Sequence, residues 1–221
     1  MLLAVDTSTR SIGVALYNGD WVLSESTWIS KSHHTVELAP AVTETLLHVG
    51  ADKTALKALG VAIGPGSFTG LRIGLALAKG LCLSHRLPLI GIPTMDVIAA
   101  AQPVEPDFEL ATVLEAGRRR LAIGWYHVQG GKWQSKDDLH NMTVEEFVES
   151  ITEPVIVCGE LNGEARQLLC DKGVVLPSPA QCVRRPGVLA ELAWKRWQAG
   201  KIDNPATLKP IYLHHGEPIP G

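Results

Sequence analysis

The sequence predicts an α/β protein of two related lobes, each with a mixed sheet flanked by helices. Three observations lead to this prediction. Short apolar runs typical of buried strands alternate with longer helical patterns along the 221 residues. An order of strand, acid, turn, strand and tyrosine near the N-terminus recurs in the second half. Between the two halves, a segment rich in proline and acidic residues, 102–108, interrupts the apolar pattern.

The first lobe is predicted to open with three antiparallel strands. The first covers residues 2–6, an apolar run 2–5 ending at Asp6, and the second covers 11–17. The hairpin signal Asn18-Gly19-Asp20 leads into a third strand, 21–28. After these strands we expect a helix over 34–48, a short strand over 59–63 and a long apolar helix that begins near Gly70.

The second lobe is predicted to repeat this opening. Matching Asp6 to Glu115 also matches Tyr17 to Tyr126. The strands that follow from this match are 110–115, 120–128 and 132–135, and a further strand is expected at 154–158, with helices near 143–150, 163–171 and 187–199. We therefore expect an N-terminal lobe over 1–104, a C-terminal lobe over 105–213 and a disordered tail over 214–221.

Composition limits the classes of function. A net charge of −3 disfavours a protein that binds nucleic acid by itself, because backbone binding depends on clustered Lys and Arg. If RNA is the target, another subunit is expected to hold it. The hydrophobic share of 46%, the charged share of 19% and the six tryptophans favour a stable core and a surface partly covered by a partner.

The cysteines and the apolar runs indicate the compartment. The four cysteines are widely spaced and form no CxxC pair, so the pattern suggests neither a zinc knuckle nor a redox dithiol. The N-terminus lacks the pattern of a signal peptide, and no apolar run reaches the length of about 18 residues that a membrane helix needs. We expect a cytoplasmic protein without a membrane partner.

The segment Gly64-Pro65-Gly66-Ser67-Phe68-Thr69-Gly70-Leu71-Arg72 is the most specific in the sequence. A glycine-rich loop between a strand and a helix can bind an anion through free amides. The Walker pattern, however, needs Lys and then Ser or Thr after the last glycine, where this chain has Leu71 and Arg72. The alternative is structural: the glycines supply unusual backbone angles and Ser67 or Thr69 caps the helix.

The helix after Gly70 has almost no polar face. Small residues recur along it, which would let a second helix approach closely, and Arg72 and Lys79 are its charges before the C-terminal end. A helix that is apolar all round needs cover on several sides. A partner protein could supply that cover, or the helix could be internal to its own lobe, and the pattern leaves both readings open.

Two further groups could carry chemistry. Asp6 lies in a turn where actin-like ATPases and sugar kinases place an acid-centred phosphate loop, but Ser8 stands where the phosphate-contacting glycine is expected. Asp6 could equally accept hydrogen bonds within its own turn. His34 and Glu37 begin a helix, and without further ligands they predict no metal site.

Three segments resemble the TsaB family, also called YeaZ. They are Leu3–Ser8, His34–Pro40 and Gly64–Arg72, and the resemblance is strong over residues 1 to about 100. It then thins and returns at Pro210-Ile211-Tyr212-Leu213. Two departures are visible. Glu115-Ala116-Gly117-Arg118 stands where the family usually has Asp-Ala-Arg-Arg, and His214 follows Tyr-Leu where Arg is usual.

The resemblance implies an actin-like ATPase (ribonuclease H-like) fold and a subunit without catalysis of its own. Its catalytic partner would be TsaD, which transfers a threonylcarbamoyl group to the adenosine next to the anticodon of tRNAs that read codons beginning with A. TsaE would join as an ATPase, and the chain alone would form a homodimer. The resemblance implies no cofactor or metal on the isolated chain, and it would place any nucleotide at the partner interface.

The same resemblance maps the partner interface onto the two first-lobe helices. The residues expected there are His34, Leu38, Val42, Thr69, Gly70, Leu71, Arg72, Gly74, Leu75, Ala78 and Lys79. Two other functions remain as alternatives. An autonomous ATP-dependent enzyme of the kinase kind is opposed by the missing phosphate-loop glycine, and a glycoprotease-like metallopeptidase is opposed by the missing metal ligands.

Overall fold

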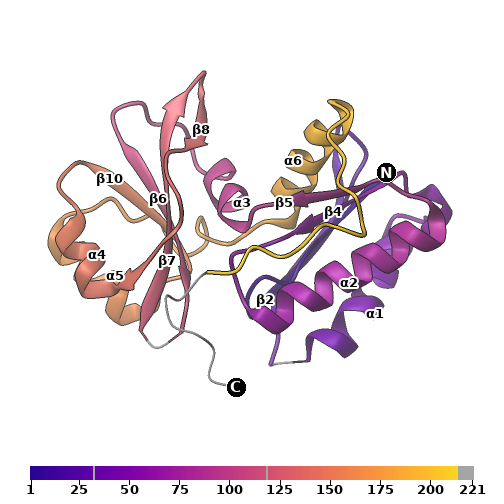
Figure 1. The fold of residues 1–221 in the computed structure, drawn as a ribbon, viewed down its shortest axis with the longest axis horizontal. Helices are drawn as coiled ribbons and strands as arrows, with labels where there is room; N and C mark the ends of the chain where they lie inside the picture. The colour runs from indigo at the N-terminus through magenta and orange to yellow at the C-terminus, as the bar shows by residue number, and fades with distance from the viewer. Residues whose placement is uncertain (32, 118, 214–221) are drawn as a thin grey trace. The chain divides into compact units, whose positions relative to one another are not determined.

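The computed structural model describes residues 1–31, 33–117 and 119–213 (Figure 1). The chain forms two compact units. The first contains residues 1–97 and 184–211, and the second contains 98–183 and continues from residue 212. The predicted lobes, 1–104 and 105–213, differ from this division because residues 184–211 pack with the first unit. Within the described residues, no helix is long and apolar enough to cross a membrane.

The first unit has a five-stranded mixed sheet in the order β3-β2-β1-β4-β5. Strands β1, β2 and β3 are antiparallel neighbours, and β4 and β5 run parallel to β1. The strands are β1 (Leu2–Asp6), β2 (Ser11–Tyr17), β3 (Val22–Ile29), β4 (Ala58–Ala62) and β5 (Leu89–Ile92). A short 3-10 turn, η1 (Lys53–Ala55), precedes β4, and α3 (Thr94–Ala100) follows β5.

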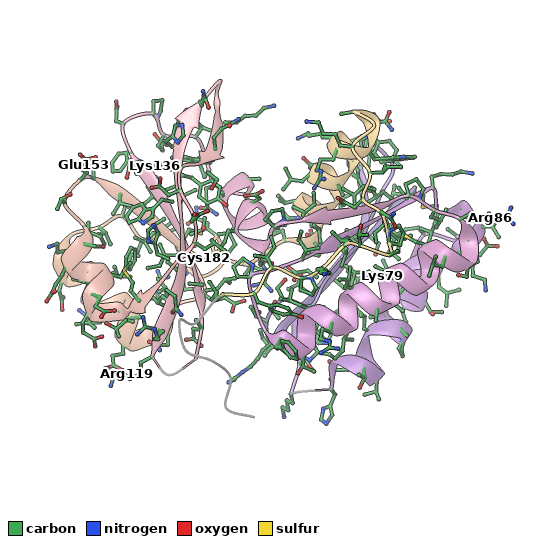
Figure 2. The ribbon with its side chains drawn as sticks, in the orientation of Figure 1. Lys79, Arg86, Arg119, Lys136, Glu153 and Cys182 are labelled. Atoms are coloured by element: carbon green, nitrogen blue, oxygen red, sulfur yellow. The ribbon has the colours of Figure 1, made fainter. Side chains whose placement is uncertain are left out.

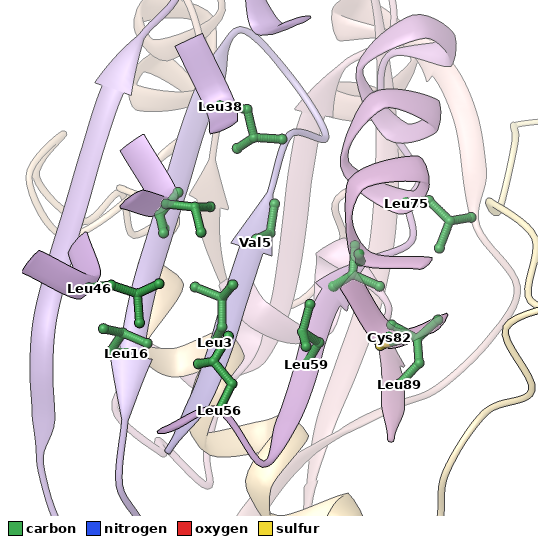
Figure 3. Close-up of a cluster of buried hydrophobic side chains, with 14 of the residues drawn as sticks. Leu3, Val5, Leu16, Leu38, Leu46, Leu56, Leu59, Leu75, Cys82 and Leu89 are labelled. Atoms are coloured by element: carbon green, nitrogen blue, oxygen red, sulfur yellow. The ribbon is translucent and has the colours of Figure 1, made fainter. Parts of the chain in front are cut away.

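Successive side chains of each buried strand point to opposite faces of the sheet, so both faces are apolar. Helices cover both of them. Leu3 and Val5 of β1 belong to the cluster that packs under α1 (His34–His48) and α2 (Phe68–His85), part of which Figure 3 shows. Leu2 and Ala4 face the opposite side and pack against α6 (Pro186–Gln198). The helix nearest the C-terminus therefore completes the core of the N-terminal unit.

The second unit has a sheet in the order β10-β6-β7-β8, with β9 also paired to β7. Its core is a hydrophobic cluster on one face of the sheet, and this cluster includes Phe147 of helix α4 and Leu169 of helix α5. The strands are β6 (Glu109–Glu115), β7 (Arg120–Gln129), β8 (Lys132–Ser135), β9 (His140–Thr143) and β10 (Val155–Gly159), and the helices are α4 (Val144–Ser150) and α5 (Gly163–Lys172).

The order β3-β2-β1-β4 in the first sheet corresponds to β8-β7-β6-β10 in the second, with the same parallel and antiparallel pairings. One detail of the predicted repeat is wrong. When Tyr17 is matched to Tyr126, the strand pairing places Leu114, rather than Glu115, at the position of Asp6. Counted between the matched pairs, Asp6 with Gly13 and Leu114 with Ala122, the chain is one residue longer in the second unit, so Glu115 lies one position beyond the equivalent of Asp6.

The other predicted elements lie close to the observed ones. The helix over 34–48 and the strands over 2–6 and 11–17 have the predicted bounds, while β5, α3, β9 and η1 were not predicted. The predicted tail, 214–221, lies outside the described residues, as do Arg118 and His214.

Candidate functional site

The turn after β1 is buried and held by its own hydrogen bonds. The carboxylate of Asp6 accepts a bond from the backbone N–H of Ser8 at 2.8 Å and one from Arg184 Nε at 2.6 Å. Arg184 also donates to the hydroxyl of Thr9 at 3.0 Å and to the carbonyl of Ser11 at 3.2 Å. Both side chains of the ion pair are almost fully buried, at 2% and 5% exposed. Asp6 therefore has a permanent cationic partner inside its own unit.

The glycine-rich segment packs directly against this turn. A Cβ atom at Gly66 would lie 2.1 Å from the carbonyl oxygen of Ser8, and one at Gly70 would lie 2.2 Å from that of Thr7. The Ser67 N–H donates to the Ser8 carbonyl at 2.6 Å, and the Thr7 hydroxyl donates to the Gly70 carbonyl at 2.7 Å. These glycines let the helix and the turn touch backbone to backbone.

The first residues of α2 also use their polar groups internally. The Ser67 hydroxyl accepts from the Gly70 N–H at 3.2 Å, so Ser67 is the helix cap, one of the two candidates that the sequence offered. The Ser8 hydroxyl lies 2.8 Å from that of Thr94, and Thr94 in turn accepts from the Gly64 N–H at 3.1 Å. A phosphate loop needs N–H groups that point at a ligand. Here the N–H groups of Gly64, Ser67 and Gly70 bond to protein oxygens.

His34 and Glu37 each contact the protein rather than one another. His34 Nε2 donates to the carbonyl of Thr9 at 2.9 Å. Glu37 accepts from Trp28 Nε1 at 2.8 Å, and this bond is the main cause that lowers the pKa of its carboxyl. Among the described residues, no group of three or more His, Cys, Asp or Glu side chains could hold a metal ion.

The predicted interface residues fall into two groups. Thr69 and Arg72 are exposed, and His34 and Lys79 are half-buried. Lys79, labelled in Figure 2, donates to the carbonyl of Leu208 at 2.8 Å. The remaining seven are buried in the unit itself: Leu38, Val42, Gly70, Leu71, Gly74, Leu75 and Ala78.

Leu75 was expected at the partner interface, but it is not exposed on its helix. Its side chain is 5% exposed and belongs to the core cluster between α1, α2 and the sheet (Figure 3). The face of α2 that is open to solvent is rotated away from Leu75. It carries Phe68, Thr69, Arg72, Ala76, Gly80 and Leu83.

A second exposed row lies on α1, which contacts α2. Val36, Ala39, Thr43 and Leu47 recur at spacings of three or four and are all exposed, with Val36 at 66% and Leu47 at 67%. On α2, Phe68 is 57% and Leu83 71% exposed. We call these two rows together the helix-pair surface. Sequence reasoning missed Phe68 and Leu83 as outer positions because α2 is apolar on nearly every side, so periodicity could not separate inner from outer positions.

Known proteins resemble this chain over nearly its whole length. The family model for TsaD, tRNA N6-adenosine threonylcarbamoyltransferase, matches residues 23–154. The tRNA threonylcarbamoyladenosine biosynthesis protein TsaB of Bacillus subtilis is 30% identical over 98% of this chain and 95% of that protein. The chain belongs to the TsaB family. TsaB of Escherichia coli is 28% identical over 97% of this chain and 94% of its own length.

Solved structures give the fold of this TsaB-family chain. YeaZ from Pseudomonas aeruginosa superposes with a TM-score of 0.76 at 22% identity, covering 95% of this chain and 99% of that one. The chain therefore has the fold of YeaZ, with the two related α/β units that the resemblance implied, and its family has a role in making threonylcarbamoyladenosine in tRNA.

Proposed function

We propose that this chain is a non-catalytic subunit that a TsaD-like transferase requires to form N6-threonylcarbamoyladenosine next to the anticodon of tRNAs that read codons beginning with A. A TsaE-like ATPase would act in the same cytoplasmic complex, and tRNA would be reached only through the partners. The family relationship supports the pathway. The non-catalytic role rests on the turn after β1.

The buried ion pair between Asp6 and Arg184 is the observation that carries this proposal. In a kinase-like ATPase the equivalent acid would serve the metal-nucleotide. Here its two oxygens accept bonds from Ser8 and Arg184, and the backbone of α2 lies against the turn. Releasing Asp6 for a nucleotide would leave a guanidinium buried without its partner, which costs several kcal/mol, on the order of 3–5. This cost opposes the kinase alternative.

The helix-pair surface is the proposed contact with the TsaD-like subunit. It combines exposed apolar side chains at its ends with Ala76 and Gly80 on the open face of α2. Small residues there would let a partner helix approach closely, and the exposed apolar side chains would gain from burial. The same surface would be covered in a homodimer when the chain is alone.

The test uses Phe68→Asp and its matched control Ile202→Asp. Phe68 is 57% and Ile202 58% exposed, both in the first unit, but Ile202 lies outside the helix-pair surface. We expect Phe68→Asp to weaken binding of a purified TsaD-like subunit at least about thirtyfold, the effect of losing an aromatic side chain that the partner would bury, while Ile202→Asp changes it little. Thermal melting should show both variants folded.

Reconstitution of tRNA modification then tests the function itself. Threonylcarbamoyladenosine formation should require this chain, and Phe68→Asp should lose it while Ile202→Asp keeps it. Wild-type binding by Phe68→Asp would place the interface elsewhere. ATP turnover by the purified chain that disappears in a folded Asp6→Asn variant would support the kinase alternative instead.

A further inference from the structure

The four cysteines are not equivalent, although their spacing in the sequence suggested no redox pair. Cys158, in β10, and Cys182, in the segment just before the chain returns to the first unit, lie in the second unit with their Sγ atoms 3.4 Å apart. The thiol of Cys158 donates a hydrogen bond to the sulfur of Cys182. The other two, Cys82 and Cys170, are respectively buried in the first unit and exposed on α5.

We propose that Cys158 and Cys182 are an oxidation site that closes to an intramolecular disulfide when the protein meets a hydroperoxide, with Cys182 reacting first. The sulfur atoms already touch, and a disulfide requires them to approach to about 2.05 Å. A displacement of that size is within the reach of side-chain rotation and small backbone shifts. The proposed function uses neither cysteine.

The surroundings distinguish the two thiols. The hydrogen bond from Cys158 is the main cause that lowers the pKa of Cys182 to about 6, with help from the Gly159 N–H and the Arg166 guanidinium and against the effect of burial. The same contact and burial raise the pKa of Cys158. Arg166 is held at this place because its Nη2 donates to the Pro177 carbonyl at 2.8 Å. Cys182 is therefore the thiolate of the pair near neutral pH, and the thiolate is the nucleophile.

The chemistry balances in two steps. The Cys182 thiolate attacks one peroxide oxygen, the O–O bond breaks, and the departing hydroxide or alkoxide takes a proton to leave as water or alcohol. The product is a sulfenic acid on Cys182. Cys158 then attacks the Cys182 sulfur, the S–O bond breaks, and the hydroxide leaves as water with the proton of the Cys158 thiol. Two thiols lose two electrons and two protons, and the peroxide is reduced.

Exposure also fits this order. Cys182 is 8% exposed, whereas Cys158 is fully buried, so an oxidant small enough to reach the site meets Cys182 first. Cys82 is a poor competitor, because burial raises its pKa to about 11. Cys170 is the accessible competitor and supplies the control. Figure 2 labels Cys182 in the second unit.

The experiment treats the reduced full-length protein with hydrogen peroxide, blocks remaining thiols with an alkylating reagent, and measures intact mass and linked peptides. The wild type should carry two alkyl groups instead of four and, apart from these groups, be two hydrogen atoms lighter, with Cys158 and Cys182 in one linked peptide and with Cys82 and Cys170 alkylated. Cys170→Ser should behave identically. Cys182→Ser should lose no hydrogen at the same dose, and Cys158→Ser should carry added oxygen on Cys182 instead.

The rate supplies a second measurement that needs no cysteine variant. Loss of the free Cys182 thiol should accelerate as the pH rises through about 6, the pKa of that group. Arg166→Gln should move this midpoint to higher pH, because the guanidinium favours the thiolate. Oxidation that begins at Cys170 with disulfide-linked dimers, or a wild type in which the 158–182 peptide is never linked, would overturn the proposal.

Discussion

The turn after β1 and the turn after β6 occupy corresponding places in two sheets of the same strand order, yet they are held in opposite ways. In the first unit, Asp6 is buried and paired with Arg184. In the second, the equivalent position is Leu114, and Glu115 beside it is exposed. Arg119 of this turn, labelled in Figure 2, pairs across the surface with Glu164 at 2.7 Å and Glu145 at 3.6 Å.

The difference shows that a repeated topology conserves strand pairing more strictly than it conserves the chemistry of a turn. The first turn is covered by the glycines of α2, so each of its polar groups must find a protein partner. In the second turn Arg119 is 69% exposed, so its ion pair with Glu164 lies in contact with water. We therefore expect the ion pair of the buried first turn to contribute more to the free energy of unfolding than the ion pair of the exposed second turn.

The largest expected effect is the loss of Arg184. Arg184→Met should lower the free energy of unfolding by about 3–5 kcal/mol, because the carboxylate of Asp6 would stay buried without its cation. Arg119→Met, at a side chain that is 69% exposed, should lower it by less than about 1 kcal/mol. Chemical denaturation of both variants measures the contrast. Equal losses would mean that burial does not separate the two turns.

A second contrast tests the close approach of α2 to the first turn. Gly70→Ala should destabilise the protein by about 1–3 kcal/mol, because the new methyl group would meet the carbonyl oxygen of Thr7. Gly80→Ala, in the same helix with nothing near its Cβ position, should stabilise it by about 0.5–1 kcal/mol. Thermal melting of the two variants shows whether each substitution raises or lowers the stability. Stabilisation by Gly70→Ala would show that the turn can move to accommodate the methyl group.

The smallest effect concerns the first helix of each unit. Thr143 caps α4 and exchanges two hydrogen bonds with Glu146, whereas His33 before α1 makes no side-chain cap. Thr143→Ala should therefore cost about 1 kcal/mol, and His33→Ala almost nothing. Hydrogen bonds from Thr143 also hold the pKa of Glu146 below its usual 4.5. The stability that the charged Glu146 contributes is fully present above pH 4.5 and is lost as the pH falls through the lowered pKa. The free energy lost in Thr143→Ala should therefore be larger at pH 7 than in acid, as unfolding curves at the two pH values can show.

Local patterns predicted most of the elements. The helix His34–His48 and the strand Ser11–Tyr17 follow directly from apolar periodicity, and the internal repeat predicted the second sheet. The position of Glu115 was wrong by one residue because a longer connection leaves no local trace. The outer face of α2 could not be read, since Leu75 and Leu83 look alike in sequence but are 5% and 71% exposed.

Long-range partners were beyond local patterns. Arg184 lies 178 residues from Asp6, and Cys182 lies 24 from Cys158, so no spacing rule connects either pair. The placement of α6 had the same limit, because an amphipathic helix near the C-terminus does not specify which of two related sheets it covers. The Asp6–Arg184 pair and the packing of α6 depend on how the chain crosses back to the first unit, which only the structure reveals.

That crossing sets an order of events during synthesis. The second unit is almost continuous, from 98 to 183, but the first is interrupted and waits for residues 184–211. Until α6 leaves the ribosome, Leu2 and Ala4 have no helix to cover their side of the first sheet, and Asp6 has no Arg184. The N-terminal strands are made first and completed last. A nascent chain that stalls before residue 184 would therefore present an apolar sheet face to chaperones.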